Sequence, residues 1–89
     1  MSIKQYIPDY EAHVKKPVPQ QIKAIAKAYC EFHKMDYSKI KRTTGIVAKR
    51  VKLLHRLLRD ASVLYSVDAQ SKALGVGEYL ILRRINETH

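Results

Sequence analysis

The chain has 89 residues, of which 46% are hydrophobic, so it is long enough for one small domain with a modest core. It carries 17 Lys and Arg residues against eight Asp and Glu residues, a formal net charge of +9 at pH 7. Cys30 is the only cysteine. This excludes an intrachain disulfide and favours a reducing cytoplasm as the location.

The first 17 residues are expected to form an arm, and residues 18–89 a single domain. Pro8 is suited to open one short helical turn, whereas Pro17 and Pro19 impose extended backbone before the first long helix. We expect Tyr6, Ile7 and Tyr10 of the arm to cover the core or a partner subunit. The domain then begins with a helix whose apolar residues recur at helical spacing, namely Ile22, Ile25, Ala26, Tyr29 and Phe32.

A second helix is predicted from Tyr37 to about Thr44, with Asp36 as its N-cap. Gly45 follows at a position suited to a positive φ angle. A third helix is predicted from there to about Asp60 or Ala61. The apolar residues on either side of the glycine are Ile40, Ile46, Val51 and Leu54. Their spacing is that of a DNA-binding helix-turn-helix.

The third helix is predicted to be amphipathic and cationic. Val47, Val51, Leu54 and Leu58 share one stripe, which we expect to be buried. The opposite face carries four cations, Lys49, Lys52, Arg56 and Arg59. Residues 36–60 hold eight basic and two acidic residues, so a net +6 of the overall +9 lies in this segment. Such a local excess predicts a polyanionic partner.

After the third helix the apolar period changes from helical to alternating. Val63, Tyr65 and Val67 alternate with neighbouring residues, and Leu80 and Leu82 do so again. We therefore expect two strands joined by a connection from Asp68 to Gly77, that is, a C-terminal β-hairpin. The expected fold class is α+β and mainly helical.

Three helices, a glycine turn between the second and third, and a two-stranded hairpin resemble the winged-helix DNA-binding domains of bacterial, plasmid and phage regulators. The resemblance covers residues 18–85 and implies a three-helix winged helix-turn-helix with the hairpin as its wing. It also implies that the outer face of the third helix lies in the major groove, with Ala48, Lys49, Lys52, Leu53 and Arg56.

Further positions follow from the same resemblance. The residues that open the helices would hold phosphates, a role for Lys41, Arg42, Thr43 and Thr44. Arg59 would contact the backbone at the far end of the third helix, and Lys72 is the only cation in the loop of the wing.

Converging acids, bases or nucleophiles are missing from the sequence, so we expect no enzymatic activity. Cys30 and His33 share one helix, but two ligands are too few for a zinc site, and neither a metal nor another cofactor is expected. No apolar run is long enough to span a membrane, so no membrane partner is expected.

The sequence thus predicts a protein that binds double-stranded DNA in a sequence-specific manner. We expect a transcriptional regulator, or an accessory factor in replication or recombination of a mobile element. A homodimer would add buried area to the small core. Two alternatives remain open: a winged-helix module that docks on another protein, with Leu53 and the charge-poor wing as its surface, and an RNA-binding protein.

Overall fold

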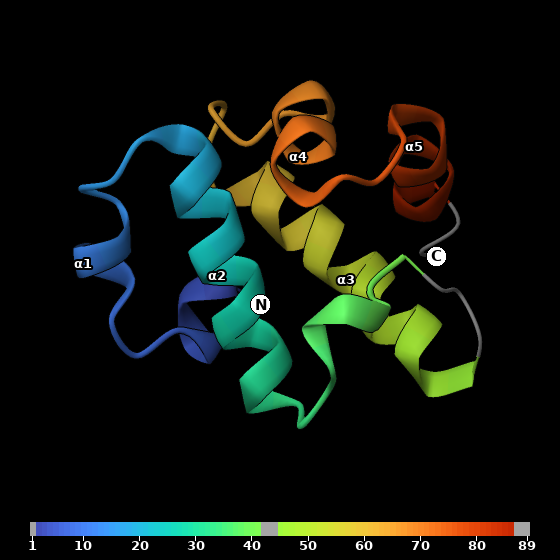
Figure 1. Ribbon diagram of the computed structural model, residues 1–89, viewed down its shortest axis with the longest axis horizontal. Coiled ribbons are helices and arrows are strands. Elements are labelled where there is room, and N and C mark those ends of the chain that lie inside the picture. Colours follow the sequence, from blue (N-terminus) through green and yellow to red (C-terminus); the bar gives the residue numbers. More distant parts are fainter. Residues whose placement is uncertain (1, 42–44, 87–89) are drawn as a thin grey trace.

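The computed structural model describes residues 2–41 and 45–86, and this part of the chain is helical and contains no strand (Figure 1). Two short 3-10 helices, η1 and η2, and five α-helices make up its regular structure. In chain order they are η1 (Ile3–Tyr6), α1 (Tyr10–His13), α2 (Val18–Phe32), η2 (Tyr37–Lys39), α3 (Gly45–Ala61), α4 (Val67–Leu74) and α5 (Glu78–Asn86).

The two long helices, α2 and α3, confirm the first and third predicted helices. Pro19 lies in the first turn of α2, where its missing N–H costs nothing. The predicted stripe of α2 is buried except for Phe32, which is 57% exposed. In α3, Val51, Leu54 and Leu58 are fully buried, as the amphipathic pattern predicts. The hydroxyl of Tyr29 donates to the carbonyl of Arg50 over 2.8 Å and so joins α2 to α3.

The remaining helices close the core from two sides. α4 packs across α2, and α5 packs against α3 and α4 (Figure 1). In the view of Figure 1, α2 and α5 lie on opposite sides of α3. Val76, in the turn between α4 and α5, is 2% exposed, and Ile81 of α5 is completely buried. The second half of the chain therefore supplies core residues from helices and from the turn between α4 and α5.

The N-terminal segment belongs to the same core. Ile3 and Ile7 are almost fully buried, and Tyr6 and Tyr10 pack against the core cluster. The ring of Tyr6 meets the ring of Tyr29 edge-on, with centroids 5.2 Å apart. The expectation that this segment covers the core is confirmed.

The predicted hairpin wing is wrong, because residues 67–86 form α4 and α5. The side chain of Ser66 accepts from the amide of Ala69 and caps α4, and Gly75 ends this helix at φ +70°. The alternation that suggested a strand does not correspond to a buried face: Tyr65 is buried, but Val63 is 93% exposed. In α5 the buried residues Ile81, Arg84 and Ile85 follow the helical period.

The predicted second helix is also wrong within the described residues. Asp36 is the cap that the sequence indicates, since its carboxylate accepts from the amide of Ser38 over 3.0 Å. The element it caps is the three-residue η2, which ends at Lys39. Gly45 does have the expected positive φ, +60°. The expected helix-turn-helix at residues 37–60 therefore lacks a full first helix up to Lys41.

Candidate nucleic-acid interface

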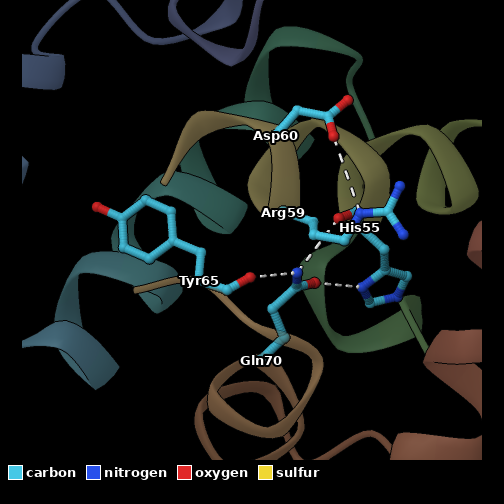
Figure 2. A network of polar contacts seen from close by, with 5 residues as sticks. All are labelled: His55, Arg59, Asp60, Tyr65 and Gln70. Carbon is cyan, nitrogen blue, oxygen red and sulfur yellow. Dashed lines mark hydrogen bonds and ion pairs between the residues drawn. The ribbon is translucent and has the colours of Figure 1, made fainter. Parts of the chain in front are cut away.

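The outer face of α3 is a cationic surface. Lys49, Arg56 and Arg59 are exposed and Lys52 is half-buried, and all four lie opposite the buried stripe. Asp60 is the only acidic residue of α3, and its carboxylate lies 3.8 Å from the Nε of Arg59 at the end of the helix (Figure 2). We define these four cations as the α3 basic face. The structure gathers them as the sequence predicts.

Two other residues expected on this face lie differently. Ala48 is half-buried, and Leu53 is half-buried and packs against the core cluster. Leu53 is therefore less available to a partner than expected. Arg50 lies at the margin of the buried stripe of α3. Its Nη1 donates to the carbonyl of His33, at the end of α2, over 3.1 Å.

The remaining predicted residues lie at other places. Lys41 is exposed, and its Nζ lies 3.5 Å from the position that a Cβ on Gly75 would occupy, so this lysine lies over the turn between α4 and α5. Arg42, Thr43 and Thr44 lie outside the described residues. Lys72 belongs to α4 instead of a wing loop, and its ammonium lies 3.1 Å from the carboxylate of Asp68, one helical turn away.

The turn between α4 and α5 comprises residues 75–77. Gly75 has the left-handed conformation that glycine adopts without strain, and its N–H donates to the carbonyl of Ser71 over 2.9 Å. Val76 then points into the core, and the carbonyl of Gly77 accepts from the amide of Ile81 in the first turn of α5. Two helices of eight and nine residues are thus joined by a three-residue turn.

The outer face of α5 was missed by the sequence analysis. Tyr79 is 77% exposed and Leu82 is 46% exposed, and together with Arg83 and Asn86 they line a shallow, open hollow. We call these four residues the α5 outer face. The signal that could have revealed it was the helical period of the buried Ile81, Arg84 and Ile85, combined with the Ser66 cap and Gly75.

A buried polar network holds α4 and α5 against α3. The Oε1 of Gln70 lies 2.9 Å from the Nδ1 of His55, and the Nε2 of Gln70 donates to the carbonyls of His55 and Tyr65 (Figure 2). On the other side of the imidazole ring, the Nη1 of Arg84 donates to the Nε2 of His55 over 3.0 Å. The Nη2 of Arg84 donates to the carbonyl of Lys41.

The network fixes the charge state of its histidine. Because the Nε2 of His55 accepts from a guanidinium, Nδ1 carries the proton and donates to Gln70. Burial, and secondarily the charge of Arg84, lowers the pKa of His55 to about 4, against the opposing effect of the Gln70 hydrogen bond. His55 is therefore neutral at pH 7 and connects α3 to Gln70 of α4 and Arg84 of α5.

The described part of the chain gives little support for a reactive thiol, a metal site or a membrane-spanning helix. Cys30 is 1% exposed, and burial raises the pKa of its thiol to about 11. Among the described residues, no three His, Cys, Asp or Glu side chains converge on a point where a metal ion could bind. Every helix in residues 2–41 and 45–86 is too short or too polar to cross a lipid bilayer.

No protein-family model matches this sequence, and comparison with the curated proteins and with the solved structures finds no significant similarity. The resemblance to winged-helix domains is therefore neither supported nor refuted by a relative. The wing itself is excluded by α4 and α5.

Proposed function

We propose that this protein binds double-stranded DNA. The observation that carries the proposal is the α3 basic face, where four cations lie along one side of a single helix. The eleven residues from Lys49 to Arg59 span about 15 Å of helix axis. Duplex DNA carries one negative charge per roughly 1.7 Å of its own axis, so a linear set of cations can displace several condensed counterions at once.

The composition of this face favours a duplex over a single strand. Proteins that bind single-stranded nucleic acid combine cations with exposed aromatic rings on which the bases stack. α3 contains no Phe, Tyr or Trp residue. On the α5 outer face, Tyr79 is the one exposed aromatic residue. A surface on which successive bases stack needs several such rings.

We further propose that binding is sequence-specific and serves regulation of transcription, or replication or recombination of a mobile element. Such a role would place the protein in the cytoplasm, together with DNA. Protein docking is the alternative that the exposed Tyr79 and Leu82 support, since exposed apolar side chains on one face are also typical of protein interfaces.

The test is fluorescence anisotropy with a labelled duplex of random sequence, about 20 base pairs long. Lys49→Ala combined with Arg56→Ala removes two cations from the α3 basic face. At about 0.1 M salt each lost phosphate contact weakens binding on the order of ten-fold. The matched control is Lys16→Ala with Lys23→Ala, which removes the same charge from two exposed positions, one before α2 and one in its second turn.

The control should bind nearly as well as the unmodified protein. Equal weakening by both double variants would mean that net charge alone attracts DNA and would contradict a defined face. Absence of duplex binding at low salt would contradict the proposal altogether. Tighter binding to a single-stranded RNA of equal length would favour the RNA alternative.

A further inference from the structure

We propose that α4, the turn at residues 75–77 and α5 form the element that reads the DNA sequence, with the α5 outer face against the base edges of the major groove. This inference rests on the proposed DNA binding, and it moves sequence reading from α3 to α5. The α3 basic face then contacts the phosphate backbone beside the groove.

The first argument is architectural. Helix-turn-helix readers place two short helices around a turn of three or four residues, often with a glycine, and the second helix enters the groove. α4 and α5 have this arrangement, with Gly75 in the left-handed conformation. By contrast, η2 before α3 has only three residues. A helix about 10–12 Å across fits a major groove about 12 Å wide.

The second argument is the chemistry of the α5 outer face. Arg83 offers a planar pair of donors that matches the O6 and N7 atoms of guanine, and Asn86 offers the donor and acceptor that match adenine. Tyr79 and Leu82 leave apolar surface in water, which the methyl group of thymine would cover. On the opposite side of the same helix, Ile81 and Ile85 anchor it in the core.

The third argument is the charge around this face. Lys41 lies over the turn, and Lys72 is exposed in the last turn of α4, where it pairs with Asp68, so two cations lie at or near the turn. Lys52 and Arg59 lie three residues before and four residues after His55. Because His55 faces Arg84 of α5, helical geometry places these two cations on the side of α3 that is turned toward α5.

Glu78 is the one carboxylate of α5 and lies exposed in its first turn. A carboxylate accepts from the N4 amino group of cytosine but is repelled by phosphates. Around this face the described cations outnumber the described carboxylates by five to three: Lys41, Lys52, Arg59, Lys72 and Arg83 against Asp60, Asp68 and Glu78. This positive balance makes DNA the occupant that we assign to the α5 outer face instead of a protein.

The experiment is selection of bound duplexes from a randomised library, followed by titration of the enriched site and of single-base variants. We expect a short enriched motif containing a guanine and an adenine. Arg83→Ala should remove the preference at the guanine. The discrimination against other bases at that position should fall by a factor between about 5 and about 150. Asn86→Ala should do the same at the adenine.

Two matched variants separate base reading from charge. Arg83→Lys keeps the cation but loses the bidentate geometry, so it should bind random duplex nearly as well as the unmodified protein while losing the guanine preference. Arg56→Ala on α3 should weaken all sequences by one common factor and leave the motif unchanged. Circular dichroism and the melting temperature check that each variant is folded.

Three outcomes would overturn the inference. Duplex binding without any enriched motif would leave the proposed function standing and remove the reading element. A motif that is unchanged in the Arg83→Ala and Asn86→Ala variants but altered by Lys49→Ala or Lys52→Ala would assign reading to α3. Failure to bind any duplex, together with capture of a second protein by the α5 outer face, would contradict both proposals.

Discussion

Arg84 and His55 form a buried hydrogen bond in which the Nη1 of the guanidinium donates to the Nε2 of the imidazole over 3.0 Å. Both residues are at most 1% exposed. The bond joins α5 to α3, and the same guanidinium holds the carbonyl of Lys41 beside the α4–α5 turn. Arg84 therefore helps to fix the position of the proposed reading helix, together with the buried Ile81 and Ile85.

The adjacent arginines of α5 should have separate roles. Arg84→Ala leaves the Nε2 of His55 and the carbonyl of Lys41 without their donor and opens a cavity, so we expect a loss of about 3 kcal/mol in the free energy of unfolding. Arg83→Ala changes an exposed residue and should alter stability by less than about 0.5 kcal/mol. Urea denaturation of both variants measures this, and equal destabilisation would contradict the assignment of Arg84 to the core and Arg83 to the surface.

Stability should decrease in mild acid because of His55. Its pKa is lowered from 6.5 to about 4, so between these values the unfolded chain binds a proton that the folded chain does not. The contribution is complete above pH 6.5, and it is lost progressively as the pH falls from 6.5 toward 4. A shift of this size corresponds to about 3 kcal/mol.

Denaturation curves at several pH values, compared with those of His55→Leu, test this. The variant should be less stable at neutral pH but should lose less stability between pH 6.5 and 4. Burial also lowers the pKa of His33, so a smaller dependence of the same sign should remain in the variant. Parallel curves for both proteins would mean that His55 is not buried as a neutral group.

The turn between α4 and α5 offers a matched pair of glycines. Gly75→Ala places a Cβ at φ +70° and should cost about 1 kcal/mol of stability, although the space there is open apart from the flexible end of Lys41. Gly77→Ala meets nothing within 4 Å and should leave stability unchanged or slightly higher. Thermal unfolding distinguishes the two, and an equal cost at both positions would argue against the left-handed turn.

Local signals in the sequence were sufficient to predict α2, α3 and the Asp36 cap. Long amphipathic helices and a capping carboxylate are determined mainly by residues that are close in the sequence. The cationic surface of α3 followed from the same periodicity. The C-terminal half was mispredicted because Val63, Tyr65 and Val67 alternate like a strand, whereas Ser66 and Gly75 mark the start and end of a helix.

The α5 outer face was missed for the same reason, because a strand assignment hides the helical face that Arg83 and Asn86 share. The buried pair of Arg84 and His55 could not be predicted either. Arginine is rarely buried without a partner, and this one acquires its partner 29 residues away through tertiary packing.

The salt dependence of duplex binding tests DNA binding most directly. If Lys49, Lys52, Arg56 and Arg59 each meet a phosphate, the slope of log affinity against log salt concentration should be around −3 to −4, and each alanine substitution among them should reduce its magnitude by about 1. A slope near zero, or binding that all four substitutions leave unchanged, would contradict the account.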